Sequence, residues 1–200
     1  MKGRMRQYPE ILVLRHGQTE WNREGRHQGQ RDSPLTDHGL QQARDQGTIL
    51  AALDADWTGF DAFYSPQLRA ARTAELALGA INKTGRADDR LKEVAFGAWE
   101  GRTPDEIERV QPGFEKARDD DPFGVHFHSP GGENFDQMTA RCQSFLSDLQ
   151  RPTVIVCHGI TSRVLRGLWL GTDSDGMSDL PGGQGCVFRL NDAGHTTLTL

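Results

Sequence analysis

One five-residue run constrains the fold of this chain most strongly, namely Thr153–Cys157, with the sequence TVIVC. It is apolar and β-branched without polar alternation, which is typical of a central parallel strand covered on both faces. Ile11–Leu14 predicts a second buried strand. Helical patterns separate the predicted strands, so we expect a three-layer α/β/α sandwich with a mostly parallel central sheet. Cys186–Leu190 and Thr196–Leu200 flank a turn sequence and predict an antiparallel hairpin at the sheet edge.

Local signals mark where helices begin. Thr36 stands at an N-cap position before a small, apolar helical face, and Ser65, followed by a proline, predicts a second helix start. Phe135–Leu149 has the spacing of an amphipathic helix. No period is visible in the segment at about residues 111–130, where we expect an irregular excursion that contributes to substrate choice. Residues 1–200 are predicted to form a single domain.

Composition excludes some classes of function. A formal net charge of −5 argues against a general nucleic-acid binder, which needs concentrated lysine and arginine, but it permits a local cationic pocket for a small anion. No stretch is long enough to span a membrane, and no apolar signal core follows the basic start Met1–Arg6. Cys142, Cys157 and Cys186 form no CxxC pair and are expected to be reduced. We therefore expect a cytoplasmic protein.

Chemically active side chains follow the predicted strands. Arg15 and His16 come directly after the first strand, and His158 follows the strand at the centre of the predicted sheet. Arg69 lies in the first turn of the helix after another strand, and Glu93 lies on a short, partly apolar segment. Because ligands bind at the carboxyl ends of strands in open α/β sheets, these side chains are expected to share one edge.

Each of these residues also has a structural interpretation. Arg15 can pair with a structural carboxylate, His16 can be an ordinary loop histidine, and Arg69 can face solvent. His158 can be a hydrogen-bonded core histidine and Glu93 a solvated acid. Their coincidence at one edge favours a common site instead, where arginines bind a phosphate and an imidazole acts as nucleophile.

Several sequence blocks carry a family resemblance. They are Leu14–Asn22 (LRHGQTEWN), Ser33–Thr36 (SPLT), Ser65–Ala74 (SPQLRAARTA), Leu91–Gly101 (LKEVAFGAWEG), Pro130–Asn134 (PGGEN) and His158-Gly159. In this order they resemble the histidine phosphatase superfamily, the group that includes the phosphoglycerate mutases. The resemblance extends from about Ile11 to Leu190 and implies a phosphoglycerate mutase-like fold.

The resemblance assigns a role to each residue at the predicted edge. His16 would be the nucleophile that attacks phosphorus and forms a phosphohistidine. Arg15, Arg69 and His158 would surround the transferring phosphoryl oxygens with positive charge. Glu93 would be the general acid that protonates the leaving oxygen and then activates water.

Further residues would bind the substrate. The resemblance implies that Asn22 adds a hydrogen bond to the phosphate, that Gln28 and Gly29 line its approach, and that Gly159 lies beside it. The expected partner is a small-molecule phosphate ester, with no nucleic acid and no membrane.

No metal or cofactor is expected, because the arginines take the place of a cation. The only metal-like spacing is that of His126 and His128, which we interpret as a histidine pair of a surface loop. Cys157 stands where the family commonly has serine or threonine, a change that bears on the hydrogen bonding of His158.

Three functions remain open from the sequence. The first is a phosphomonoester hydrolase, because Phe96–Gly101 resembles broad-specificity and α-ribazole phosphatases. The second is a bisphosphoglycerate-dependent phosphoglycerate mutase, although the segment between Glu93 and His158 is too short for the mutases' extended insertion. The third is a non-catalytic phosphate-ligand or protein-binding module, which has no need for a placed acid.

Overall fold

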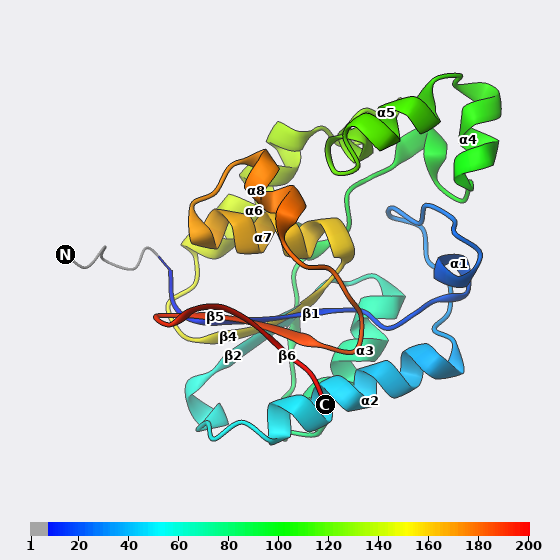
Figure 1. The fold of residues 1–200 in the computed structure, drawn as a ribbon. Helices are drawn as coiled ribbons and strands as arrows, with labels where there is room; N and C mark the ends of the chain where they lie inside the picture. Colours follow the sequence, from blue (N-terminus) through cyan, green and yellow to red (C-terminus); the bar gives the residue numbers. More distant parts are fainter. Residues whose placement is uncertain (1–7) are drawn as a thin grey trace.

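The computed structural model describes residues 8–200, and within them six strands form one sheet (Figure 1). The strands are β1 Ile11–Arg15, β2 Asp61–Tyr64, β3 Arg86–Ala87, β4 Thr153–Cys157, β5 Val187–Asn191 and β6 Gly194–Leu198. Their spatial order is β3-β2-β4-β1-β5-β6. The basic start Met1–Arg6 lies outside the described residues. None of the helices within residues 8–200 has the length and apolar character needed to cross a membrane.

The centre of the sheet is parallel and its edge is antiparallel. Every residue of β4 is buried, and β4 pairs in parallel with both β1 and β2, as its unbroken apolar run predicted. β5 and β6 pair antiparallel beyond β1, which confirms the predicted edge hairpin. β3 was not predicted, because its two exposed residues are too few to show a pattern.

Helices cover both faces of the sheet, which confirms the three-layer sandwich. The helices are α1 Glu20–Arg23, α2 Asp37–Ala51, α3 Leu68–Gly79, α4 Pro104–Val110, α5 Phe114–Asp120, α6 Phe135–Ser147, α7 Gly159–Leu170 and α8 Ser174–Asp179, with the 3-10 turns η1 Trp57–Gly59, η2 Asp89–Leu91, η3 Gly97–Trp99 and η4 Gly124–Phe127. Figure 1 shows α2 and α3 against one face and α6 and α7 against the other.

Side-chain alternation along β1 builds a core on each face. Ile11 and Val13 belong to the larger cluster, which includes the buried faces of α6 and α7. Leu12 and Leu14 belong to the cluster with α2 and α3. Because successive strand residues point to opposite faces, an apolar strand that is buried on both sides anchors both helical layers. This anchoring holds the carboxyl ends of the parallel strands in place.

The two predicted helix starts have different outcomes. Thr36 is the N-cap of α2, and its hydroxyl accepts a hydrogen bond from the Gly39 amide at 3.0 Å. The helix predicted to begin after Ser65 instead begins at Leu68, with Gln67 as N-cap. Ser65 still continues the sheet, because its amide donates to the Val156 carbonyl at 2.9 Å. Its hydroxyl accepts a long hydrogen bond from the Gln67 backbone amide, at 3.4 Å, and can also bond a second partner.

The segment at residues 111–130 is less irregular than its sequence suggested. It contains α5 and the short turn η4, and it buries Phe114, Phe123, Val125 and Phe127 in the larger core cluster. These helical pieces are too short to show a 3.6-residue period, which explains why the pattern was not visible.

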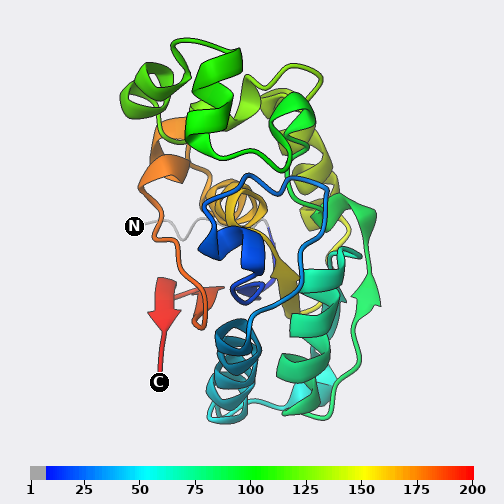
Figure 2. The ribbon, with the colours of Figure 1, turned by 90° about the vertical axis from the view of Figure 1, so that its right-hand side faces the viewer.

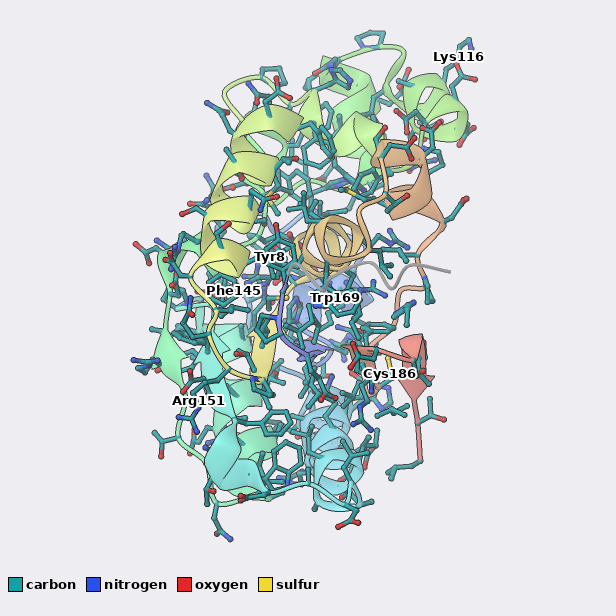
Figure 3. All side chains as sticks on the ribbon, turned by 90° about the vertical axis from the view of Figure 1, so that its left-hand side faces the viewer. Tyr8, Lys116, Phe145, Arg151, Trp169 and Cys186 are labelled. Atoms are coloured by element: carbon teal, nitrogen blue, oxygen red, sulfur yellow. The ribbon has the colours of Figure 1, made fainter. Side chains whose placement is uncertain are left out.

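Two further views locate the ends of the sheet. Figure 2 looks onto the edge at which β1 ends, where the loop around α1 (blue) crosses between α2 and α3 on one side and α4 and α5 (green) on the other. Figure 3 looks from the opposite side, where Phe145 of α6 and Trp169 of α7 lie in the helical layer above the sheet and Lys116 of α5 lies at the periphery. The carboxyl edge is thus framed by loops.

Candidate active site

A cavity of about 290 Å³ opens at this carboxyl edge of the sheet. It is lined by eight of the nine residues predicted for the site, namely Arg15, His16, Asn22, Gln28, Gly29, Arg69, Glu93 and Gly159. The ninth, His158, is completely buried behind it, with its ring centroid 5.2 Å from that of His16. The topology therefore brings together residues that are widely separated in the sequence.

His16 is held as a neutral imidazole with one unprotonated ring nitrogen. Its Nδ1 lies 2.7 Å from the Gly17 carbonyl, to which it donates, so the lone pair remains on Nε2. Arg69 Nε donates to this Nε2 at 3.3 Å. Burial, followed by the charges of Arg69 and Arg15, lowers the pKa of His16 well below its ordinary value. A neutral, oriented imidazole is the form that a nucleophile requires.

A close backbone contact places the loop that carries His16. A Cβ on Gly17 would lie 2.1 Å from the Gly39 carbonyl oxygen, and a Cβ on Gly39 would lie 2.0 Å from that of Gln18. Both positions therefore require glycine. The Gly17 amide also donates to the Thr73 hydroxyl at 3.1 Å, which ties the loop to α3.

Arg69 is buried and held from several directions. Its Nη1 donates to the Arg31 carbonyl at 2.7 Å and to Asp32 Oδ1 at 2.9 Å, while Nη2 donates to the Gly29 carbonyl at 2.8 Å. The side chain is 2% exposed. Burial lowers the pKa of Arg69, and the charges of Glu93 and Asp32 oppose this effect. The guanidinium is therefore preorganised beside His16.

Arg15 differs because it has no such partners. Its Nε is buried and makes no hydrogen bond within residues 8–200. Burial lowers the pKa of Arg15, Glu93 raises it, and Arg163 lowers it further. A Cβ on Gly159 would lie 3.3 Å from Arg15 Cζ, so the first residue of α7 leaves little room beyond the guanidinium. A half-buried guanidinium at the cavity wall, whose Nε has no partner among residues 8–200, is suited to bind an anion.

His158 is a neutral histidine with one bonded nitrogen. Its Nε2 lies 2.7 Å from the hydroxyl of Ser65, which precedes α3. Its Nδ1 has no hydrogen-bond partner in the described part of the chain. Burial and then the charge of Arg69 lower the pKa of His158 well below its ordinary value. Both causes favour the neutral imidazole in the free protein, and the positive charge expected on His158 beside a phosphoryl group stays a prediction.

Glu93 is anchored at the N-terminus of α7. Its Oε1 accepts hydrogen bonds from the Thr161 amide at 3.1 Å, the Thr161 hydroxyl at 3.0 Å and the Val94 amide at 3.1 Å. Its Oε2 accepts from the Ile160 amide alone, at 3.2 Å. Orphan amides at a helix N-terminus attract negative charge, so they hold the carboxylate in one orientation. Oε2 keeps a free lone pair for a proton.

The predicted substrate-binding residues lie on the loop after β1. Asn22 Oδ1 accepts from the Thr19 amide at 3.1 Å and from Gln184 Nε2 at 3.2 Å, which directs the Nδ2 donors of Asn22 elsewhere. Gln28 is 6% exposed. Gly29 has a φ of +53°, and a Cβ there would lie 2.4 Å from Glu100 Oε1, so this loop conformation requires glycine.

The two histidines with metal-like spacing have different surroundings. His128 is exposed, as expected for a surface loop residue. His126 is instead half-buried and lines the cavity, because η4 turns it toward His27, with ring centroids 5.8 Å apart. Burial, then His27 and Arg163, lower the pKa of His126 to about 4. Among the described residues, no cluster of three or more His, Cys, Asp or Glu side chains is arranged to hold a metal.

Cys157 does not contact the His158 ring. Its thiol lies 3.8 Å from the His158 carbonyl oxygen, and burial raises the pKa of Cys157. The Cys157 side chain belongs to the larger core cluster, on the face of β4 that α6 and α7 cover. The replacement of serine or threonine by cysteine therefore leaves the imidazole to Ser65.

Sequence reasoning missed several residues of the cavity. Arg163, His27 and Phe96 also line it. Arg163 carried a usable signal, because it lies four residues after Gly159 on α7 and so shares its helix face. Asp32, which pairs with Arg69, carried none, because only the folded loop brings them together.

Comparison with known proteins identifies the family of this chain. Residues 11–198 match the model of the histidine phosphatase superfamily, branch 1, and the chain belongs to this family. The predicted family is thus confirmed, and with it the expectation of an enzyme that hydrolyses phosphate esters.

Named relatives cover most of the chain. It is 33% identical to a glucosyl-3-phosphoglycerate phosphatase of Mycolicibacterium vanbaalenii, over 93% of this chain and 84% of the relative. It is also 33% identical to a probable phosphoglycerate mutase of Klebsiella pneumoniae, over 81% of this chain and 75% of the relative. Among solved structures, a putative α-ribazole-5'-P phosphatase of Escherichia coli is similar, with a TM-score of 0.78 and 26% identity over 96% of each chain.

Proposed function

We propose that this chain hydrolyses small phosphate monoesters through a phosphohistidine on His16. The observation that carries the proposal is the state of His16, a neutral imidazole at the cavity wall whose Nε2 is the unprotonated nitrogen and accepts only a long, 3.3 Å hydrogen bond from Arg69. A module that only binds phosphate needs the arginines, but it does not need an oriented nucleophile or the anchored carboxyl of Glu93.

The reaction has two steps. His16 Nε2 attacks phosphorus, the bond from phosphorus to the leaving oxygen breaks, and Glu93 gives its proton to that oxygen. A water molecule then attacks the phosphohistidine, Glu93 accepts the water proton, and the phosphorus–nitrogen bond breaks to release inorganic phosphate. Oε2 is the oxygen of Glu93 suited to this exchange, because it accepts only one hydrogen bond.

The remaining predicted residues would hold the phosphoryl group. Arg15 and Arg69 supply positive charge, while Asn22 and the backbone at Gly159 supply donors. The Nδ1 of neutral His158 has no protein partner among the described residues and is available as a further donor. All five groups line or adjoin one cavity, and their chemistry supports a role for each in phosphate binding.

Trapping of labelled phosphate tests the proposal. A brief reaction with a labelled phosphate monoester, quenched in base, should leave phosphate on His16. We expect His16→Ala to lose at least about ten thousandfold in turnover, because removal of a nucleophile eliminates the covalent route. His38→Ala, which changes an exposed histidine on α2, is the matched control and should keep wild-type activity. Turnover by His16→Ala near the wild-type rate would refute the proposal.

We further propose that the leaving group carries a second negative charge. Within the described residues, the only hydrogen bond of the Arg163 guanidinium is from Nε to the Leu180 carbonyl, at 3.1 Å, so both Nη groups are available in the cavity. Arg163 lies one helical turn, or about 6 Å along the axis, from Gly159. The relative from M. vanbaalenii is named for glucosyl-3-phosphoglycerate, a phosphorylated glycerate. This name supports a carboxylate on the leaving group as the partner of Arg163.

A phosphoglycerate mutase is the second candidate, because the relative from K. pneumoniae is named as a probable one. A mutase must exclude water while its intermediate reorients. Gly25 and Gly182 are exposed at the cavity mouth, which favours hydrolysis instead. Isomerisation of a monophosphoglycerate that is faster than phosphate release, with bisphosphoglycerate present, would favour the mutase.

A cytoplasmic location is also part of the proposal. Cys142, Cys157 and Cys186 are all buried free thiols, which is the state expected in a reducing compartment.

A further inference from the structure

Gln67 uses its side chain in an unexpected way for its position. It is the N-cap residue of α3, yet its side chain makes no capping hydrogen bond to the helix. The side chain is instead 5% exposed and turned away from the helix, towards the loops below the cavity. The first amide of α3, that of Leu68, is instead capped by Asp32 Oδ2 at 3.0 Å, which leaves the amide group of Gln67 for other contacts.

The two ends of the Gln67 amide bond to two different loops. Nε2 donates to the Gly29 carbonyl at 2.9 Å, and Oε1 accepts from the Glu93 backbone amide at 2.7 Å. Gly29 belongs to the loop after β1, whereas Glu93 lies in the irregular segment between η2 and η3. One side chain therefore bridges two segments that have no regular secondary structure of their own.

Each bridged loop controls a different side of the chemistry. The Gly29 carbonyl also accepts from Arg69 Nη2 at 2.8 Å, so Gln67 and Arg69 share one acceptor. On the other side, the Glu93 amide belongs to the residue whose carboxyl faces the cavity. Gln67 itself is not among the residues that line the cavity. Any effect that it has on the reaction must pass through its neighbours, which are Gly29, Glu93 and the Ser65 hydroxyl, 3.5 Å from Gln67 Oε1.

Only a glutamine side chain satisfies both contacts. The Gly29 carbonyl needs a donor and the Glu93 amide needs an acceptor, and a primary amide offers one of each. An ionised glutamate offers acceptors only, and methionine offers no comparable group. Asparagine is one methylene shorter and cannot span the same gap.

We propose that Gln67 is a positioning residue that sets the distance between Glu93 and the phosphate held at Arg69. The proposal rests on the proposed function, because Glu93 must act as the acid for its distance from phosphorus to matter. A misplacement of about 1 Å can lower a reaction rate a hundredfold, so a bridge between the acid and the phosphate site affects catalysis without touching substrate.

The test compares two leaving groups in the first turnover of the full-length protein. The alkoxide of glycerol phosphate needs a proton to leave, whereas the nitrophenolate of para-nitrophenyl phosphate does not. We expect Gln67→Met to lower the ratio of the glycerol phosphate burst rate to the nitrophenyl phosphate burst rate by about ten- to a hundredfold. A residue that only stabilises the fold would lower both burst rates together and leave the ratio unchanged.

Two further variants keep the test informative if Gln67→Met folds poorly. Gln67→Glu keeps an acceptor for the Glu93 amide but loses the donor to the Gly29 carbonyl, so the bridge is broken and the ratio should also fall, by at least about threefold. Gln46→Met removes another buried amide near the site, one that donates to the Arg15 and Cys186 carbonyls, and it should leave the ratio unchanged. A wild-type ratio in Gln67→Glu, or a ratio in Gln46→Met as low as that expected for Gln67→Met, would overturn the proposal.

The outcomes separate this proposal from the proposed function. If the wild-type protein shows neither a burst nor labelled phosphate on His16, the phosphohistidine mechanism itself fails. If the wild type shows both, and Glu93→Gln lowers the ratio while Gln67→Met leaves it unchanged, only the positioning role of Gln67 fails. A fall of the ratio in Glu93→Gln, Gln67→Met and Gln67→Glu, but not in Gln46→Met, supports the bridge.

Discussion

Two groups of cavity residues are held differently. We call them the phosphate end (Arg69 and Glu93) and the leaving-group end (Arg163, His27 and His126) after the roles proposed for them. At the phosphate end, Arg69 and Glu93 are each held by several hydrogen bonds to backbone groups of separate segments. At the leaving-group end, Arg163 makes one hydrogen bond, and His27 and His126 each have a buried Nδ1 without a partner within residues 8–200. The difference indicates that reaction geometry is preorganised, whereas substrate recognition is completed by the ligand itself.

The largest effect should come from Glu93→Gln at the phosphate end. An alkyl phosphate should lose about a hundred- to ten-thousandfold in its first-turnover rate, because its leaving alkoxide needs a proton. A nitrophenyl phosphate should be slowed much less. Burst measurements on both substrates are needed, because steady-state turnover also includes the water step. Equal losses for both leaving groups would exclude Glu93 as the acid, and a residue of the segment at 111–128 would then be the next candidate, since Glu100 does not line the cavity.

Arg69→Ala should have the next largest effect. We expect about a hundred- to thousandfold loss in kcat/KM for every substrate, because the guanidinium contacts the phosphoryl group whatever the leaving group is. Arg72→Ala is the matched control, one turn later on α3, where the arginine is exposed and pairs with Glu75. A loss restricted to one class of leaving group would contradict the division between the two ends.

Arg163→Gln should affect only substrates with a second charge. A monophosphoglycerate should lose about ten- to a hundredfold in kcat/KM, the value of one charged hydrogen bond, whereas glycerol phosphate should change less than about threefold. These substrates differ in having a carboxylate or an alcohol at the same carbon. Arg44→Gln, on the exposed face of α2, is the matched control. Equal loss for both substrates would place Arg163 at the phosphate instead.

The smallest effect concerns stability at low pH. Burial keeps His126 neutral in the folded protein, with its pKa lowered to about 4, while the unfolded chain takes up a proton near its ordinary value. Stability is therefore lost as the pH falls below about 6.5, by up to about 2 kcal/mol for this residue at pH 5. His126→Gln should remove that share of the pH dependence in denaturant titrations at pH 7.5 and 5. An unchanged pH dependence would mean that His126 is not held neutral.

The sequence predicted the phosphate end well because local patterns carry it. Each apolar run is followed by a residue with a proposed role in the chemistry, so Thr153–Cys157 located His158, and the run before Arg15 located His16. The general rule that ligands bind at the carboxyl ends of parallel strands then predicted that these residues share one edge of the sheet.

The remaining features depend on contacts between distant segments. Ser65 was predicted to cap a helix, but its amide is paired with β4 and its hydroxyl with His158, neither of which a local pattern reveals. His126 was interpreted as a surface residue because η4 is too short to show a period. Gln67 resembles any polar residue before a helix until the loops around Gly29 and Glu93 are folded.

The contact between Gly17 and Gly39 has a consequence for how sequences of this kind can diverge. No side chain fits at either position, because the obstacle on each side is backbone rather than a movable group. A second substitution cannot relieve the clash that the first one causes, so a side chain at Gly17 cannot be compensated by a change at Gly39, or the reverse. A related chain that keeps the histidine but has lost either glycine must hold its nucleophile loop elsewhere. Such a chain is where a non-catalytic descendant of this fold should be sought.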